Sequence, residues 1–240
     1  GLGLELIVSV VILLISLIVL NKASHMTITN AVKVSEITGF GKTTIGLTLI
    51  AFSTSLPELS VAVISAFLGV ASVSIGNILG SNICLIIGVG LLLVTLKHSK
   101  PMNDTVPSMP KRELESFYSG LFIASIIPLS LVYIAYASQL IGLILLTIFA
   151  IYTYQLLREK RPMEETDGNA PKEERSKLRR YTLLTFVGIA GVIASSYFIV
   201  DSASSIAETL GVPQSLIAAT IVAFGTSVPE LSISVGAFVK

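Results

Sequence analysis

The sequence predicts an all-α protein that crosses a membrane several times, and three observations carry this prediction. Hydrophobic residues make up 52% of the 240 residues and charged residues only 13%, with a mean hydropathy of +0.85. Soluble domains carry roughly a quarter charged residues. The apolar residues gather into stretches of about twenty, the length that spans the hydrocarbon core of a bilayer. The basic residues fall only between alternate stretches.

Seven apolar segments follow one another along the chain, and each is expected to form one transmembrane helix. The first is short, and the fourth and fifth are separated by only two residues, Ala137 and Ser138. The segments are residues 4–20, 43–68, 70–96, 117–136, 139–157, 181–200 and 213–239.

All sixteen Lys and Arg residues lie on one side of this seven-span arrangement. Fifteen fall within 22–42, 97–112 and 158–180, and the last is Lys240. The positive-inside rule makes this side cytoplasmic and places the N-terminus outside the cell membrane. Residues 158–180 mix both signs of charge and are expected to form a flexible cytoplasmic linker. The formal net charge of +1 gives no indication of a nucleic-acid partner.

One stretch of the chain occurs twice. Residues 48–62 and 220–234 are identical at nine of fifteen positions, and each copy contains the run Thr-Ser-x-Pro-Glu-Leu-Ser. Each copy places a carboxylate, a proline and several hydroxyls inside an apolar segment. An ionisable group in such a segment indicates an ion pathway by default.

The copies lie in segments two and seven, whose order differs by an odd number, so they cross the bilayer in opposite directions. We therefore expect an inverted repeat, the architecture of many secondary transporters. Residues 1–137 would form the first transmembrane repeat with its motif at 43–96, residues 138–157 the fifth helix, and residues 181–240 the start of the second repeat. The second motif, at 213–240, lacks the continuation that follows the first, so further helices are expected beyond Lys240.

The spacing of polar residues in each copy places them on one face of a helix. The first set is Ala51, Thr54, Ser55 and Glu58, and the second is Ala223, Thr226, Ser227 and Glu230. Pro57 and Pro229 each remove one intrahelical hydrogen bond, so both helices are expected to kink or break in mid-membrane. Carboxylate, hydroxyl and carbonyl oxygens are ligands that hard cations prefer.

A structural kink with each Glu paired to a base is the alternative interpretation. No Lys, Arg or His lies within a predicted membrane segment to pair with Glu58 or Glu230, which disfavours it. Gly76 and Gly80 predict either close helix packing or backbone exposed to an ion. Asn77 could bind an ion or hydrogen-bond across helices.

The two copies of the motif resemble the two repeats of the cation/Ca²⁺ antiporter superfamily, and within it the prokaryotic sodium/calcium exchangers. The resemblance rests on 51–58 with the stretch Gly-Asn-Ile-Leu-Gly-Ser-Asn at 76–82, and on 223–230. It implies ten transmembrane helices in two inverted halves, of which this chain would contain seven. It also implies exchange of Ca²⁺ for Na⁺ by alternating access, with the bilayer as the only other partner and a monomer sufficing.

The resemblance also implies roles for individual residues. Four would form the Ca²⁺ site: Thr54, Glu58, Thr226 and Glu230. The carbonyls of Ala51 and Ala223, together with Ser55, Ser81 and Ser227, would help to hold Na⁺. No cofactor is implied beyond the transported ions.

Two positions depart from the family pattern. Ser53 stands where Gly is usual, and Leu85 stands where Asn or Asp is usual, which removes a polar group near the centre of the expected site. A Ca²⁺/H⁺ exchanger of the same superfamily is therefore the first alternative, and a cation channel is a remote one. An enzyme is not expected, since the sequence has no nucleophile–base pair and no nucleotide-binding motif.

Overall fold

The computed structural model describes residues 2–38, 44–97, 138–159 and 176–232, and within these ranges the chain is helical with no strand. The expected all-α membrane protein is confirmed. Contacts divide the chain into one unit of residues 1–96 with 164–240 and a second unit of residues 97–163. Residues 117–136, the fourth predicted segment, lie outside the described ranges.

Helix α1 (Leu2–Thr38) is much longer than the apolar segment that predicts it. The predicted segment ends at Leu20, but no Gly or Pro interrupts residues 21–38, so the helix continues. At 1.5 Å per residue it is about 55 Å long, well beyond the roughly 30 Å of a hydrocarbon core. Lys22 and Lys33, which fall between the first two predicted segments, therefore lie on α1.

Helix α7 (Leu178–Leu210) also extends beyond its predicted segment. Residues 201–210 were expected to belong to an external connection, but they form the last turns of α7. Gly211 ends the helix with φ 66°, and its N–H bonds the carbonyls of Ala207 and Glu208. Glycine suits this left-handed position because it has no Cβ.

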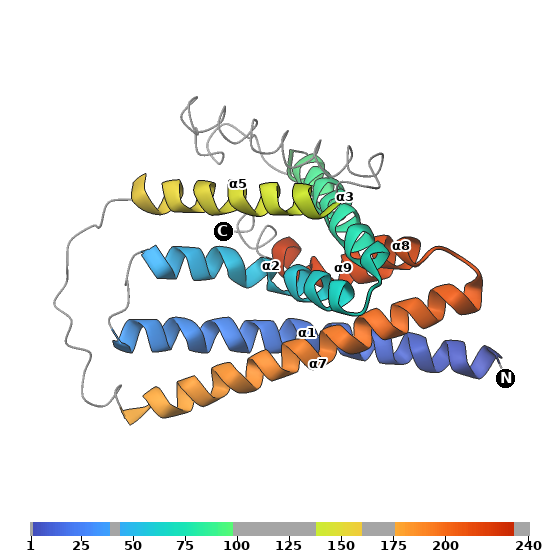
Figure 1. Cartoon of the computed structure of the whole chain (residues 1–240), viewed down its shortest axis with the longest axis horizontal. Helices are drawn as coiled ribbons and strands as arrows, with labels where there is room; N and C mark the ends of the chain where they lie inside the picture. Colours follow the sequence, from blue (N-terminus) through green and yellow to red (C-terminus); the bar gives the residue numbers. More distant parts are fainter. Residues whose placement is uncertain (1, 39–43, 98–137, 160–175, 233–240) are drawn as a thin grey trace. The chain divides into compact units, whose positions relative to one another are not determined.

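Helices α1 and α7 pack against each other in antiparallel directions (Figure 1). Near the start of α1, Ser9 Oγ lies 3.1 Å from Ser205 Oγ of α7. Near its end, Lys33 Nζ lies 4.9 Å from the ring centre of Tyr181. Between them, a side chain at Gly188 would collide with α1. Small residues thus allow the close backbone approach that stabilises helix pairs in membranes.

The core of the first unit lies where α1 and α7 meet α2 (Thr44–Phe67). Its aliphatic side chains are almost fully buried and come from all three helices. They include Leu13, Leu20, Val61, Ile199, Val200 and Ile206.

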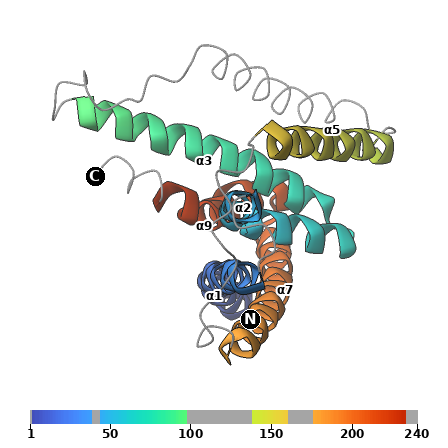
Figure 2. The same ribbon diagram turned by 90° about the vertical axis from the view of Figure 1, so that its left-hand side faces the viewer.

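Helix α3 (Ala71–Lys97) follows α2 and runs steeply across it (Figures 1 and 2). It packs in a parallel direction along a helical stretch made of α8 (Gln214–Ile217), the π-helix η1 (Ala218–Val222) and α9 (Ala223–Thr226).

Two glycines of α3 permit this packing. A Cβ on Gly76 would collide with the carbonyl of Ser215, and one on Gly80 would collide with the backbone of Ala219. Both partners are backbone atoms that cannot move aside easily. The interpretation of these glycines as close-packing residues is confirmed.

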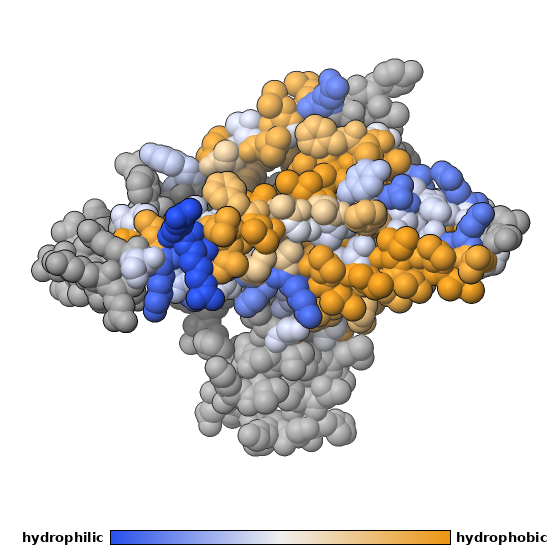
Figure 3. Space-filling view, turned by 90° about the horizontal axis from the view of Figure 1, so that it is seen from below, coloured by the Kyte–Doolittle hydropathy of each residue, from blue (hydrophilic) through white to orange (hydrophobic). Residues whose placement is uncertain are grey.

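Many large apolar side chains point outward, and Figure 3 shows a surface that is largely apolar. Phe67 is 84% exposed and Phe186 65% exposed. Soluble monomers rarely expose apolar patches on this scale, whereas lipid tails cover them in a membrane. Helix α5 (Ser138–Glu159), in the second unit, likewise exposes Leu140 and Leu146.

Three of the described helices are long and apolar enough to cross a membrane. They contain the ranges Gly3–Thr38, Ala71–Gly88 and Leu178–Leu210. Shorter apolar helical stretches occur at Thr54–Phe67, Gln139–Ile151 and Gln214–Thr226. The chain is thus a multi-pass membrane protein, while its full number of spans stays a prediction.

Candidate functional site

The two copies of the repeated motif differ in backbone structure. In the first copy, α2 stays helical through Pro57. A transmembrane helix tolerates proline when neighbouring groups pair with the freed carbonyl. In the second copy the helix is interrupted at one residue: α9 ends at Thr226, Ser227 forms a turn, and residues 228–232 are helical again.

A π-helix, Ala218–Val222, leads directly into the second copy. Single π-turns are rare and often lie at functional sites. The π-helix and the turn at Ser227 flank the short helix α9, Ala223–Thr226, within the second copy. This arrangement aims carbonyl and hydroxyl groups at the neighbouring helices.

Glu58 on α2 faces the hydroxyls of the second copy. Ser227 Oγ donates a hydrogen bond of 3.5 Å to Glu58 Oε1, and the Thr226 side chain lies beside the same carboxyl group. Thr226 and Ser227 are fully buried. The first copy's carboxylate is thus held among side chains of the second copy.

Glu230 shows the reciprocal arrangement. Thr54 of α2 hydrogen-bonds its carboxyl group, and Glu230 lies close enough to Glu58 for the two charges to interact. Residue 54 contacts residue 230, and residue 58 contacts residues 226 and 227. Residue numbers therefore increase along one copy while they decrease along the other. The two motifs therefore cross in antiparallel directions.

A buried polar network joins α3 to this pair. Thr226 Oγ1 donates to Asn77 Oδ1 at 3.1 Å and lies 3.3 Å from the carbonyl of Ala223. Ser81 Oγ lies 3.5 Å from both the Ala223 carbonyl and Thr226 Oγ1. Three segments that are distant in sequence thus direct oxygens to one place.

The structure does not gather every predicted site residue. Ser55 is exposed, unlike Ser227, its fully buried counterpart in the second copy. Ala51 lies on α2, three residues before Thr54. Leu85 is half-buried on α3, one turn beyond Ser81 and therefore on the same face.

Several buried polar atoms of the site have no hydrogen-bond partner. They are Oε2 of Glu58, Oε2 of Glu230 and Nδ2 of Asn77. Buried polar groups are paired in the great majority of cases, so unpaired ones require an explanation such as an ion. Among the described residues no cluster of three His, Cys, Asp or Glu side chains occurs. Any cation held here would be bound by two carboxylates and neutral oxygens.

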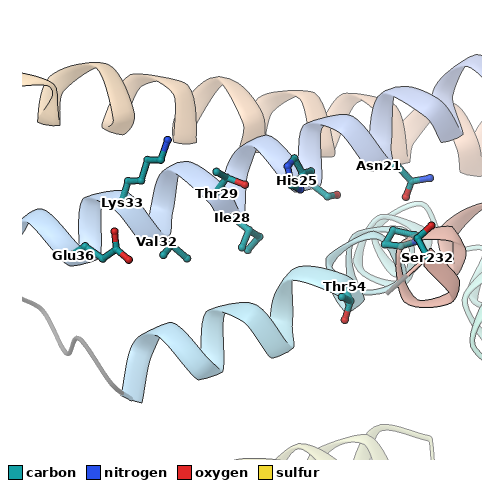
Figure 4. Close-up of a pocket in the computed structure, with 11 residues that line it drawn as sticks. Asn21, His25, Ile28, Thr29, Val32, Lys33, Glu36, Thr54 and Ser232 are labelled. Atoms are coloured by element: carbon teal, nitrogen blue, oxygen red, sulfur yellow. The ribbon is translucent and has the colours of Figure 1, made fainter. Parts of the chain in front are cut away.

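A cavity of about 590 Å³ reaches the site from the second half of α1 (Figure 4). Its polar lining on α1 runs from Asn21 to Glu36, and it ends against Thr54 and Pro229. Thr54 also contacts Glu230, so the cavity adjoins one of the two carboxylates.

Two asparagines make hydrogen bonds to the second copy that the sequence analysis did not predict. For Asn77 the sequence left open ion binding or a hydrogen bond between helices, and in the structure its Oδ1 accepts a hydrogen bond from Thr226. Asn21 was missed: its Nδ2 donates a 2.9 Å hydrogen bond to the carbonyl of Gly225. A polar residue at the edge of an apolar run was the only signal for Asn21, and Lys22 beside it made the position resemble a loop.

Comparisons with known proteins agree with one another. The profile of the family described as "Sodium/calcium exchanger protein" matches residues 8–158 and 180–240. An uncharacterized membrane protein of Methanocaldococcus jannaschii is 28% identical over 97% of this chain and 72% of its own length. CaxA of Alkalimonas amylolytica, named as an antiporter, is 30% identical over 98% of this chain and 73% of its own.

A third relative is the sodium/calcium exchanger MaX1 of Methanosarcina acetivorans, which is 28% identical over 96% of this chain and 74% of its own length. No solved structure matches. The family match covers both copies of the motif and most of the sequence between them. The chain therefore belongs to the sodium/calcium exchanger protein family.

Proposed function

We propose that this chain is a secondary transporter that exchanges Ca²⁺ for Na⁺ across the cell membrane. One observation carries the proposal: Glu58 and Glu230, from the two copies of the repeat, meet among buried hydroxyls. One oxygen of each carboxylate is buried without a partner. Two carboxylates without a compensating positive charge are costly inside a membrane, so we expect a bound cation to supply that charge.

Charge explains why such a site would exchange ions. Two ionised carboxylates carry a charge of about −2, which one Ca²⁺ or two or more Na⁺ would balance. With no ion bound, the pair would be a repelling, desolvated charge that opposes passage through a closed state. Occupancy by either ion would remove that barrier. After the site releases one ion on one side of the membrane, it would have to bind the other ion before it could reopen to the first side.

The reciprocal contacts support an inverted repeat. Glu58 faces hydroxyls of the second copy and Glu230 faces Thr54 of the first. The antiparallel crossing of the copies is what an inverted repeat requires. Two halves related in this way can open the same central site to either side of the membrane by exchanging conformations.

The cavity along α1 offers a path to this site. Its outer lining includes Lys33 and Glu36, and its inner end lies at Thr54. The distribution of basic residues predicts that the Lys33 end of α1 is cytoplasmic. We propose that the structure represents a state open toward the cytoplasm, with the N-terminus and the start of α1 on the outside and the 158–180 loop on the cytoplasmic side.

The coupling ion is the part of the proposal with a specific rival. Leu85 lies on the face of α3 that carries Ser81, and its side chain offers no oxygen to a cation. Fewer ligands near Ser81 would weaken binding of additional Na⁺. Exchange of Ca²⁺ for H⁺, carried by Glu58 and Glu230, is therefore the second candidate.

Flux through liposomes tests the proposal. The full-length protein would be reconstituted into Na⁺-loaded vesicles, and ⁴⁵Ca²⁺ uptake followed on dilution into Na⁺-free buffer. An imposed pH gradient without Na⁺ forms the parallel arm. Uptake driven by Na⁺ alone is expected; uptake driven only by the pH gradient would establish the H⁺-coupled rival. Conductance that does not saturate and needs no counter-ion would indicate a channel.

Variants in the same assay test the site. Glu58→Gln keeps the shape of the side chain but removes the charge, and it should abolish Ca²⁺ uptake. The matched control is Glu208→Gln, an exposed glutamate near the end of α7. Near-normal flux in Glu58→Gln would refute the assignment of the site.

A further inference from the structure

Pro229 leaves one backbone carbonyl of the second motif without its usual partner. In a regular helix the N–H of residue 229 would bond the carbonyl of Gly225, but proline has no N–H. An unpaired carbonyl in the membrane costs free energy, so such groups find partners elsewhere. The fate of the Gly225 carbonyl is therefore a question that the structure can answer.

A side chain of α1 takes the place of the missing N–H. Asn21 Nδ2 donates a 2.9 Å hydrogen bond to the Gly225 carbonyl, across 204 positions of sequence. Figure 4 shows the Asn21 side chain extending from α1 toward the segment that carries Ser232. This is a direct polar bond between α1 and the interrupted motif.

The fit of α1 against Gly225 makes this bond specific. A Cβ on Gly225 would lie 2.6 Å from Leu17 Cδ1, so the Leu17 side chain would have to move for any larger residue at position 225. Leu17 and Asn21 are four residues apart and lie on one face of α1. Leu17 covers the Cα of Gly225 while Asn21 bonds its carbonyl, so α1 fixes this peptide from two sides.

The fixed peptide directly precedes the ion-facing groups. Gly225 is followed by Thr226 and Ser227, whose hydroxyls lie beside Glu58, and Glu230 comes one turn later. A rotation of the peptide at Gly225 would redirect all of these groups. The backbone position at Gly225 therefore sets the geometry of half the site.

We propose that Asn21 is a positioning residue for cation binding, because its amide replaces the helical hydrogen bond that Pro229 removes and holds the second motif in its ion-binding geometry. Asn21 acts through the Gly225 carbonyl rather than by touching the ion. The inference rests on the proposed function, since it assumes that Glu58 and Glu230 bind the cation.

A matched pair of substitutions tests the bond itself. Asn21→Leu removes the donor at similar size, and Asn30→Leu is the control, because Asn30 lies on the same helix and its Nδ2 donates to the Met26 carbonyl within its own turn. Ca²⁺ affinity of the full-length protein in detergent would be measured by isothermal titration calorimetry. Asn21→Leu should raise Kd about tenfold, as expected when a buried carbonyl loses its partner, and Asn30→Leu by less than about twofold.

A second substitution separates positioning from general destabilisation. Pro229→Ala restores an N–H at position 229, which can bond the Gly225 carbonyl directly. In that background Asn21→Leu should change Kd by less than about twofold, a non-additive result typical of residues that share one partner. The same factor in both backgrounds would overturn the inference, as would an unchanged Kd for Asn21→Leu alone.

The remaining outcomes are also decisive. If Pro229→Ala does not fold, Asn21→Gln replaces it, because the longer amide retains the donor. Affinity should then fall in the order wild type, Asn21→Gln, Asn21→Leu, and a reversal of the last two overturns the inference. Glu58→Gln serves as the arm for the proposed function: if it binds Ca²⁺ normally, the assignment of the site fails rather than the role of Asn21.

Discussion

Removing one buried hydroxyl, that of Thr226, should destabilise the ion-free protein and weaken Ca²⁺ binding. Thr226 is fully buried, and its hydroxyl donates to Asn77 Oδ1 at 3.1 Å, with the Ala223 carbonyl at 3.3 Å. Thr226→Val keeps the shape of the side chain and removes the donor. Asn77 Nδ2 already has no partner, so the variant leaves a buried amide entirely unpaired.

The expected change in the free energy of unfolding follows from the hydrogen bonds that Asn77 would lose. Leaving one buried acceptor without a partner costs about 1–3 kcal/mol, so Thr226→Val should lower the free energy of unfolding by about 2 kcal/mol. Replacing both partners by apolar groups is far less costly. The double variant Thr226→Val/Asn77→Leu should therefore be more stable than Thr226→Val alone.

Unfolding of the Ca²⁺-free protein in detergent, followed by circular dichroism, measures this effect. Thr220→Val is the control, since Thr220 is exposed and its hydroxyl donates to the Leu216 and Ile217 carbonyls of its own helical stretch. If Thr226→Val is no less stable than Thr220→Val, the hydrogen bond to Asn77 does not stabilise the site and the reasoning is refuted. Calorimetry on the same samples should show Ca²⁺ binding weakened about tenfold, as for loss of one ligand oxygen or hydrogen bond.

Three further predictions concern the site and its packing. Ser227→Ala should weaken Ca²⁺ binding more than Ser55→Ala does, because Ser227 is buried against Glu58 whereas Ser55 is exposed; equal effects in calorimetry would contradict the geometry. Leu85→Asn should steepen the dependence of Ca²⁺ flux on Na⁺, since it adds an oxygen beside Ser81, and an unchanged Hill coefficient would count against Na⁺ binding there. Gly80→Val should lower the melting temperature, since overpacking costs about 1–3 kcal/mol of stability and the new Cβ meets the Ala219 backbone. Gly142→Val, which has open space, should not.

The repeated motif allowed much of the site to be predicted from the sequence. Equal spacing in the two copies placed Glu58 and Glu230 as partners, and the structure brings both to one place with Thr54, Thr226 and Ser227. Their proximity could be expected because an intramembrane carboxylate has few tolerable environments, and their role in ion binding stays a prediction.

The sequence does not predict which copy has an interrupted helix. Both copies have proline at the same place, yet α2 continues through Pro57 while the second copy turns at Ser227. In the second copy, Asn21 of α1 donates a hydrogen bond to the Gly225 carbonyl, a tertiary contact that the sequence pattern does not predict. Helix lengths were also underestimated, because hydropathy falls before Thr38 and Leu210 although the backbone remains helical.

The crossed arrangement of carboxylates and hydroxyls bears on how such a protein could have arisen. Each glutamate lies beside hydroxyls from the opposite copy, so a single copy would contain only half of the proposed cation site. An ancestral gene encoding one copy could have bound a cation only when two identical chains, inserted in opposite orientations, met in the membrane. Fusion of the duplicated genes would have made that encounter certain, and each copy would then have been free to diverge, as the corresponding positions Ser53 and Gly225 have done.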